Sequence, residues 1–238
     1  MMTTIAKESI ELMLTTTTTE SSSSTTTTTT ESSTITTTEP LSTFIITAEP
    51  GSTTTEADLI SLDSTDRGVY AIYQTKISKN SQRSAVGNQY GSYPPDQSPD
   101  NACDGNHLTK YLNFGMCFED SHGVQCGLDT GFFLELKRGA SLVTGLQICT
   151  AEDFATRDPL MISLEGSNEP YPTLILGPSW TLIYNGPSGL QKDPGRLTCG
   201  IVQLINNSAQ YKSYRFLVSG KRNISNSVQY SELKLFGH

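Results

Sequence analysis

The first 65 residues most constrain what this 238-residue chain can fold into, because threonine and serine dominate them. They contain 23 Thr and 11 Ser, including the uninterrupted run 21–30. Such a segment has too little apolar surface to offset the backbone entropy of ordering, about 1–2 kcal/mol per residue. We therefore expect residues 1–65 to be a disordered low-complexity segment, either an O-glycosylated mucin-like stalk or a plain linker.

The net charge of the chain is concentrated in the same segment. Residues 1–65 hold nine of the 24 acidic side chains and one of the 16 basic ones, which leaves 15 of each sign in residues 66–238. An electrically neutral domain disfavours nucleic acid as a partner, because a binder must present positive charge to the phosphates. No apolar run approaches the roughly 18–20 residues that cross a bilayer, so we expect no membrane insertion.

The amino-terminal residues do not resemble a secretory signal, since an acidic side chain interrupts the short apolar stretch 10–14. Two interpretations follow: an intracellular protein, or a fragment of a longer multidomain chain that starts upstream. The cysteines and the N-glycosylation sequons at Asn206 and Asn223 favour the second interpretation. With it we expect an extracellular or cell-surface location.

From about residue 66 onward apolar residues alternate, and turn residues recur at short intervals. The alternation is clearest where Tyr214, Phe216 and Val218 share one face. Many short strands separated by turns predict an all-β fold, an antiparallel β-sandwich over residues 66–238. Its length of about 170 residues is enough for one hydrophobic core. Strands are expected at 69–78, 131–137, 141–150, 161–166, 180–184, 201–204, 213–218 and 228–236.

Three stretches then occur in a characteristic order. They read YPPDQSPDNACDGNHLTKYLNFG at 93–115, CTAEDFATRDPLMISLEGS at 149–167, and VQYSEL at 228–233, with Trp180 and YKSYRF at 211–216 between the last two. This order resembles the galactose-binding-like superfamily, which includes the discoidin (coagulation factor C-type) domains and related carbohydrate-binding modules. Over about residues 68–238 the resemblance implies an eight-stranded jelly-roll whose loops at one end bind ligand.

The turn DGNHLT at 104–109 is rich in oxygen donors. Gly105 permits a tight bend, which lets side-chain and backbone oxygens converge as Ca²⁺ requires. In the resembled modules such a turn pairs with a glutamate on the last strand. The alternative is an Asx-type turn that caps backbone N–H groups without a metal. The resemblance thus implies a weak structural calcium site formed by Asp104, Asn106, Thr109 and Glu232.

A second motif, Arg157-Asp158-Pro159, leads into the strand expected at 161–166. In the functional interpretation Arg157 donates two hydrogen bonds to a sugar or carboxylate. In the structural one it forms an ion pair that fixes the turn, with Glu152 and Asp153 as ready partners. Asn113 and Asp158 belong to the same resembled sub-pattern and join Arg157 as candidate ligand-binding residues.

The aromatic candidates are divided between core and surface. Trp180 alternates with apolar neighbours and is expected in the core, whereas Tyr171 and Phe118 are loop aromatics on which a sugar ring could stack. Tyr171 completes the candidate ligand-binding set. The segment 170–179 is an insertion relative to the resembled pattern, and its residues 174–176 are expected to form an extra edge strand.

The five cysteines contain no CxxC pair, which argues against a thioredoxin-type site or a zinc ribbon. Cys117 and Cys126 bracket a polar loop and are expected to form a local disulfide. Zinc binding by these two cysteines with His122 is the alternative, although a fourth ligand is missing. Cys149 and Cys199 are the candidates for a second disulfide, which leaves Cys103 either buried beside the 104–109 turn or paired with another chain.

The sequence contains no HExxH, GxSxG, GxGxxG or P-loop motif, and its three histidines do not assemble into a catalytic set. We therefore expect a non-catalytic binding module that recognises glycans or glycoproteins. The alternatives are a protein–protein adhesion module without a sugar site, and an accessory domain of a larger enzyme.

Overall fold

The computed structural model describes residues 58–60 and 65–238. The predicted stalk, residues 1–65, lies almost entirely outside the described residues, so its disorder stays a prediction. Residues 58–60 form a strand that pairs with the last strand of the domain.

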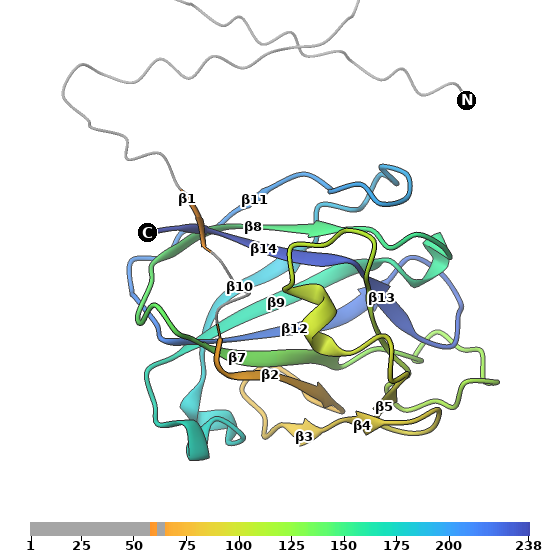
Figure 1. Cartoon of the computed structure of the whole chain (residues 1–238), viewed down its shortest axis with the longest axis horizontal. Helices are drawn as coiled ribbons and strands as arrows, with labels where there is room; N and C mark the ends of the chain where they lie inside the picture. The colour runs from red at the N-terminus through yellow and green to blue at the C-terminus, as the bar shows by residue number, and fades with distance from the viewer. Residues whose placement is uncertain (1–57, 61–64) are drawn as a thin grey trace, which may run out of the picture. The chain divides into compact units, whose positions relative to one another are not determined.

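Two antiparallel sheets build the domain (Figure 1), which confirms the predicted all-β sandwich. The strand order is β10-β9-β12-β7-β2-β3 in the six-stranded sheet and β1-β14-β8-β11 in the four-stranded sheet. The six-stranded sheet consists of β2 (Thr65–Tyr73), β3 (Gln82–Arg83), β7 (Thr130–Leu136), β9 (Pro159–Ser167), β10 (Thr181–Pro187) and β12 (Ser213–Lys221). The four-stranded sheet consists of β1 (Asp58–Ile60), β8 (Val143–Cys149), β11 (Gln203–Leu204) and β14 (Glu232–Gly237).

Two smaller pairs lie beside these sheets. They are the antiparallel pair β6 (Tyr111–Asn113) with β13 (Val228–Tyr230), and the parallel pair β4 (Ala85–Val86) with β5 (Ser92–Tyr93). Each of the eight predicted strands overlaps an observed strand. The last predicted strand is divided at Ser231, because β13 pairs with β6 whereas β14 pairs with β8.

The extra edge strand predicted at 174–176 is wrong. This segment lies between two 3-10 helices, η3 (Tyr171–Thr173) and η4 (Gly177–Ser179). The backbone N–H groups of Leu174 and Leu176 donate to carbonyls three residues earlier, as in a 3-10 turn, and are not available to a strand ladder. Two further 3-10 helices are η1 (Pro99–Ala102) and η2 (Ala155–Arg157).

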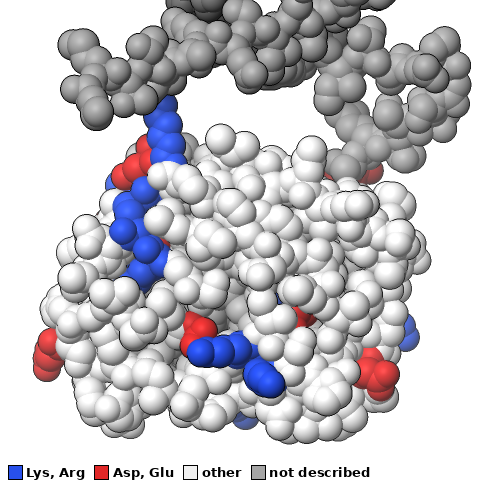
Figure 2. Space-filling model, turned by 180° about the vertical axis from the view of Figure 1, so that it is seen from behind, with Lys and Arg blue, Asp and Glu red and all other residues white. Residues whose placement is uncertain are grey.

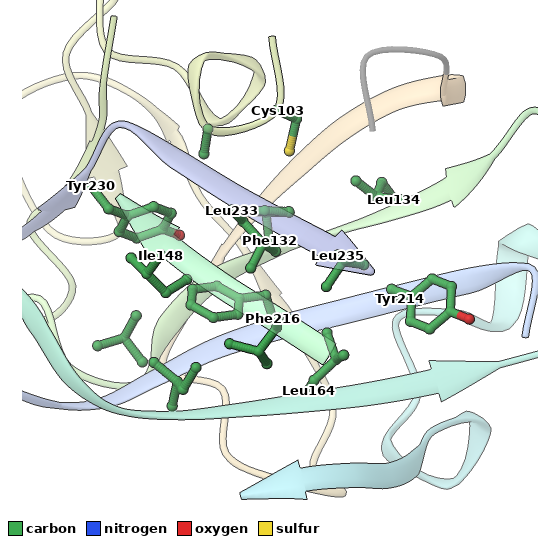
Figure 3. Close-up of a cluster of buried hydrophobic side chains, with 14 of the residues drawn as sticks. Cys103, Phe132, Leu134, Ile148, Leu164, Tyr214, Phe216, Tyr230, Leu233 and Leu235 are labelled. Carbon is green, nitrogen blue, oxygen red and sulfur yellow. The ribbon is translucent and has the colours of Figure 1, made fainter. Parts of the chain in front are cut away.

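The main core fills the space between the sheets (Figure 3). From β12 the predicted inward face, Tyr214, Phe216 and Val218, is buried in it. Phe132 of β7 and Tyr230 of β13 extend the cluster by aromatic contacts. Apolar side chains on alternate positions of several strands therefore hold the two sheets together, mainly by removing apolar surface from water.

Alternate side chains of the six-stranded sheet point the other way. The register places Tyr70 of β2, Phe133 of β7, Arg215 of β12 and Glu165 of β9 side by side in one row across this outer face. Phe133, Arg215 and Glu165 are nevertheless buried. A second apolar cluster covers this row, to which the insertion contributes Leu174.

On the face of the molecule seen in Figure 2, basic side chains form a short strip at the upper left with acidic groups beside it, and the remaining charged groups are separate. In the part of the chain that the structure describes, no helix has the length and apolar character needed to span a membrane.

Candidate functional site

A buried ion pair organises the outer face of the six-stranded sheet. Arg215 donates from Nε to Glu165 Oε2 at 2.7 Å, and both side chains are fully buried. Arg215 Nη1 also donates to the Lys79 carbonyl at 2.9 Å, and Glu165 Oε1 accepts from the Ser78 backbone N–H at 2.8 Å. The pair therefore anchors the loop after β2 to the sheet.

The insertion is fixed against the same row. Trp180 lies over the guanidinium of Arg215 at 4.8 Å and packs on Phe133 with ring centroids 5.9 Å apart. Its indole N–H donates to the Leu174 carbonyl at 2.8 Å, which closes the insertion on itself. Trp180 is thus buried as predicted, although in the outer cluster rather than between the two sheets.

Between the insertion and strands β2 and β3 lies a cavity of about 280 Å³, which we call the tyrosine pocket. Strands β2 and β7 contribute a first group to its lining, in which Tyr70, Ile72 and Phe133 face outward. The insertion contributes a second group, and β3 with its preceding loop contributes a third. These lining residues are Tyr70, Ala71, Ile72 and Phe133, then Tyr171, Pro172 and Ile175, then Ser81 and Arg83.

Aromatic rings give the pocket its shape. Tyr70 stacks on Phe133 with centroids 5.2 Å apart and planes 13° apart, and Tyr171 lies 5.3 Å from Tyr70 at 56°. The guanidinium of Arg83 lies 5.9 Å from the centre of the Tyr70 ring, and that of Arg67 lies 5.0 Å from the Tyr171 ring. Cation–π attraction of this kind steadies exposed arginines over tyrosine rings.

The Tyr171 hydroxyl remains protonated at neutral pH. Burial and the neighbouring Tyr70 hydroxyl raise the pKa of Tyr171 to about 12, against the opposing effect of Arg83 and Arg67. Tyr70 donates its own hydroxyl hydrogen to the Arg67 carbonyl at 3.0 Å. The pocket thus combines aromatic faces with hydroxyl and guanidinium groups, as sites for small polar ligands commonly do.

The predicted ligand-binding residue Asp158 is not exposed to solvent. Its side chain is fully buried and accepts two parallel hydrogen bonds from Arg196, at 2.8 and 2.7 Å, and a third contact from Arg222 Nε at 3.3 Å. Arg196 Nη2 also donates to Asp193 Oδ1 at 2.7 Å, so Arg196 is paired with two carboxylates. In this position Asp158 joins three loops and leaves no exposed oxygen for a ligand.

Asn113 is also fully buried, and both the nitrogen and the oxygen of its side-chain amide form hydrogen bonds within the protein. Its Nδ2 donates to the hydroxyls of Ser84 and Tyr111, at 2.9 and 2.7 Å, and its Oδ1 accepts from the Gly115 backbone N–H at 2.8 Å. Asn113 therefore fixes the exit of β6 rather than facing solvent.

Arg157 occupies the loop end, by which we mean loops 115–126, 150–158 and 222–227. These loops are joined by backbone hydrogen bonds, for example Asn223 N–H to the Thr156 carbonyl at 3.0 Å. The Arg157 guanidinium donates to Gln229 Oε1 at 3.1 Å and lies 4.2 Å from the exposed Phe154 ring. Burial lowers its pKa from the ordinary value.

The carboxylates considered as ion-pair partners of Arg157 pair with Lys110 instead. Lys110 Nζ lies 2.7 Å from Asp153 Oδ1 and 3.3 Å from Glu152 Oε1. Neither of the two carboxylates is within ion-pair distance of Arg157, although the charge of Asp153 still acts on it.

The 104–109 turn brings the predicted calcium residues together. Asp104 accepts from the Asn106 backbone N–H and from the Thr109 hydroxyl, both at 2.8 Å, which is the Asx-type turn of the alternative interpretation. The buried Glu232 reaches this turn from β14, and its Oε1 has no hydrogen-bond partner among the described residues. Burial and the carboxylate of Asp104 raise the pKa of Glu232 to about 8.

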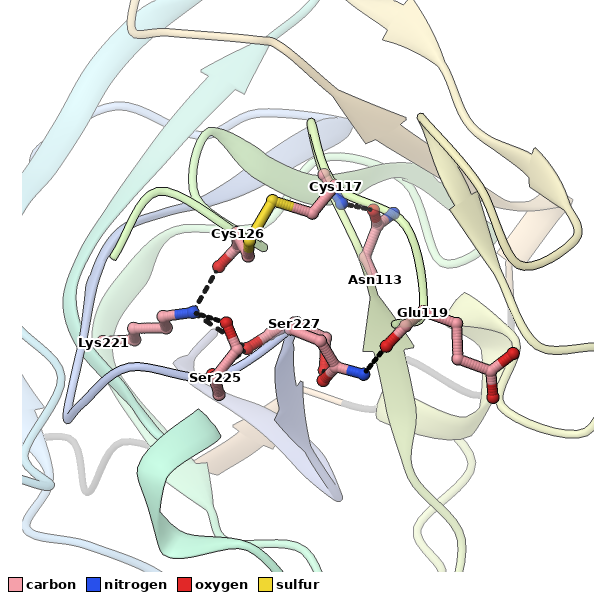
Figure 4. The surroundings of a disulfide bond; sticks show 9 residues. Asn113, Cys117, Glu119, Cys126, Lys221, Ser225 and Ser227 are labelled. Carbon is pink, nitrogen blue, oxygen red and sulfur yellow. Dashed lines mark hydrogen bonds between the residues drawn. A yellow bond between two sulfur atoms is a disulfide. The ribbon is translucent and has the colours of Figure 1, made fainter. Parts of the chain in front are cut away.

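Both expected disulfides are present, Cys117–Cys126 and Cys149–Cys199, and Cys103 is buried with a free thiol. The disulfide occupies the sulfurs that the alternative zinc site with His122 would need. Figure 4 shows how the Cys117–Cys126 loop is held: Lys221 Nζ donates to the Cys126 carbonyl at 2.6 Å and to the Ser225 carbonyl at 3.0 Å. The disulfide loop is thereby tied to the segment after β12.

Sequence reasoning found Tyr171 but missed its partners Tyr70, Phe133 and Arg83. The alternation of Tyr70 with Ile72 inside a predicted strand signals that the two share a face. Arg83 gives no such signal, because its position depends on the pairing of a two-residue strand with Ile72 and Tyr73.

No protein-family model matches the chain, and no curated protein matches it. Solved structures of similar fold include a carbohydrate-binding module of a family 31 glycoside hydrolase from Clostridium perfringens, with 13% identity and a TM-score of 0.46 over 65% of this chain and 90% of that chain. Another is the family 32 module of C. perfringens NanJ in complex with galactose, with 11% identity and a TM-score of 0.43 over 60% and 88%.

A third is a module of C. perfringens in complex with GalNAc-β-1,3-galactose, with 14% identity and a TM-score of 0.43 over 61% of this chain and 90% of that chain. All three are carbohydrate-binding modules, the class that the sequence motifs resemble.

Proposed function

We propose that the β-sandwich is a non-catalytic module that binds glycans or glycoproteins, and that the tyrosine pocket holds the sugar. The observation that carries this proposal is the aromatic cavity around Tyr70, Phe133 and Tyr171. A sugar ring offers an apolar face of C–H groups and an edge of hydroxyls. The rings match the face, and the tyrosine hydroxyls and Ser81 match the edge.

The proposal places recognition on the side of the sandwich rather than on the loops at one end, where the resemblance predicted it. A volume of about 280 Å³ lies just below the roughly 300–1,000 Å³ typical of ligand pockets. One sugar unit or a chain end therefore fits better than a long oligosaccharide. Affinity per module is then low, and repeated modules on a longer chain would raise it.

We also propose that the module works outside the cell or on its surface. Two disulfides within one domain support this, because such bonds persist in oxidising compartments. The 1–65 segment would then act as a stalk that presents the domain.

A structural calcium ion is part of the same proposal. Asp104 and Glu232 place two carboxylates close together, and the unpartnered Glu232 Oε1 supplies the orphaned acceptor that a cation would satisfy. Asn106 and Thr109 add neutral oxygens. The ion would join the loop before β6 to the last strand, and its effect on sugar binding would be indirect.

A glycan array probed with the full-length, oxidised protein tests the proposed function. We expect binding to a subset of glycans, competed by free sugar and lost in Tyr171→Ala. Tyr90→Ala serves as the matched control, because Tyr90 is an exposed tyrosine that contacts Phe118 instead of the pocket. An array without any competed signal would contradict the proposal.

One observation favours protein–protein adhesion as a second candidate. Apolar side chains are exposed on and beside the loop end, and a sugar site does not need them. They are Tyr90, Met116, Phe118, Val124, Phe154 and Ile224. Binding to a protein that survives enzymatic deglycosylation of that protein would support adhesion. A catalytic domain on the same chain would support the accessory role instead.

A further inference from the structure

We infer that the ligand of the tyrosine pocket is an acidic saccharide, whose carboxylate or sulfate group is bound by Arg83. The inference rests on the proposed function, since it names the class of sugar that the same pocket takes.

The charged residue that lines the pocket is an arginine. Arg83 is the single charged residue among those that line the cavity, and no aspartate or glutamate lines it. Within residues 58–60 and 65–238, no ion pair involves Arg83. An exposed guanidinium at an otherwise uncharged aromatic cavity, without an ion-pair partner among the described residues, provides a positive potential there.

A second arginine lies beside the pocket. Arg67 lies over the Tyr171 ring and forms an ion pair with Glu135 at 3.9 Å. The charged groups that act on the Tyr171 hydroxyl are Arg83 and Arg67, and both lower its pKa as cations do. Two guanidinium groups therefore bracket the two tyrosine rings.

The arrangement of Arg83 suits an anion that sits on the rings. Its guanidinium lies over Tyr70, and in the described part of the chain it makes no hydrogen bond. A guanidinium that contacts an aromatic face keeps N–H donors free, and two of them match the oxygens of a carboxylate or sulfate. A sugar seated against Tyr70 and Tyr171 would bring its acidic group to these donors.

The test is isothermal titration calorimetry of the full-length protein with pairs of ligands that differ only in charge. One pair is trigalacturonate and its methyl ester; the other is 6′-sulfated lactose and lactose. The variants are Arg83→Gln and Arg83→Lys. Arg138→Gln is the control, because Arg138 is exposed in the turn after β7 and is not part of the pocket lining. Thermal unfolding checks that each variant is folded.

We expect the wild type to bind at least one acidic ligand about tenfold or more tightly than its neutral partner, as charge-assisted hydrogen bonds imply. Arg83→Gln should remove this preference, so that the acidic and the neutral ligand of a pair bind alike, and Arg83→Lys should restore only part of it. Arg138→Gln should keep the preference. The pair that shows the preference distinguishes a carboxylate from a sulfate ligand.

Two results would overturn the inference alone: neutral ligands that bind as tightly as acidic ones, or an Arg138→Gln variant that loses the preference as fully as Arg83→Gln does. The absence of binding to every saccharide, charged or neutral, would overturn the proposed function itself. The failures of the two proposals are therefore distinguishable.

Discussion

At and beside the loop end, Asp158 and Asn113 are fully buried, and arginine, hydroxyl or backbone partners take up their hydrogen-bonding groups. In the tyrosine pocket, by contrast, Arg83 is exposed and forms no ion pair with a described residue, and Tyr171 is only partly buried. Both regions contain residues of the kinds that bind ligands. They differ in whether those groups are already occupied.

This difference shows why residue type alone is a poor guide to a site. A buried polar group must find partners within the protein, since leaving it unpaired costs about 1–3 kcal/mol. Once paired, it stabilises the fold and is no longer available. A group that remains exposed beside a cavity has no such role and can serve a ligand.

The largest expected effect is on stability, from Asp158→Asn. The substitution removes the charge that Arg196 and Arg222 share, and breaking a buried ion pair costs roughly 3–5 kcal/mol. Urea unfolding measures the loss. Sugar binding by the folded fraction should be unchanged. A stable variant that no longer binds sugar would instead make Asp158 a ligand residue and reverse the comparison.

The pH dependence of stability tests the calcium turn. In EDTA the pKa of Glu232 is about 8 in the folded protein, above its ordinary value of 4.5. The stabilisation is therefore complete below about pH 4.5 and is lost as the pH rises through 8, by on the order of 1.4 kcal/mol per unit of pKa shift. Thermal unfolding across this range follows the loss.

Glu232→Gln is the control for that measurement, because it has no carboxyl group to titrate and should lack this component of the slope. Saturating Ca²⁺ should flatten the wild-type profile, since the bound ion keeps the carboxylate charged. Profiles that coincide for the wild type and Glu232→Gln in EDTA would contradict the placement of Glu232 beside Asp104. A stability profile that Ca²⁺ leaves unchanged would contradict the proposed calcium site.

An intermediate effect is expected in the tyrosine pocket. Tyr171→Ala should weaken sugar binding by roughly tenfold, because the variant loses an aromatic contact of about 0.5–1.5 kcal/mol together with a hydroxyl partner. Titration calorimetry with a sugar identified on the array gives the ratio. Stability should change little, since Tyr171 packs at the edge of the outer cluster. Equal weakening by Tyr90→Ala would move the site to the loop end.

The smallest effect is expected for Arg157→Ala. This arginine contacts Gln229 and Phe154, both at the loop end or next to it. We expect sugar affinity to stay within about twofold of the wild type, as for a group with no ligand contact. A surface plasmon resonance comparison on an immobilised glycan is sensitive enough. A loss of tenfold or more would favour the loop end as the sugar site.

The fold could be predicted largely from sequence because its strands are encoded locally. The alternation of Tyr214, Phe216 and Val218 fixes which side of β12 enters the core, and nothing remote is needed to recognise it. The position of the insertion, residues 170–179, could also be recognised from the sequence, but its backbone conformation could not. Its prolines and the contacts of Trp180 with Arg215 decide that conformation, and the contacts depend on the completed sheet.

The candidate site could be predicted only in part because its members meet through long-range pairing. Tyr171 lies about a hundred positions from Tyr70 in the chain, and the register of β2 with β7 places Phe133 beside Tyr70. Likewise, Arg196 binds Asp158 across a separation of 38 residues. A sequence pattern marks which residues have suitable chemistry, but the partners that occupy them appear only in the folded structure.

The most direct test of where the sugar binds is an NMR titration of the isotope-labelled full-length protein with a glycan identified on the array. We predict chemical-shift changes that concentrate in residues 70–72, 81–83, 133 and 171–175. The loop end, residues 115–126, 150–158 and 222–227, should remain unperturbed at the same saturation. Changes confined to the loop end would contradict the assignment of the tyrosine pocket as the sugar site.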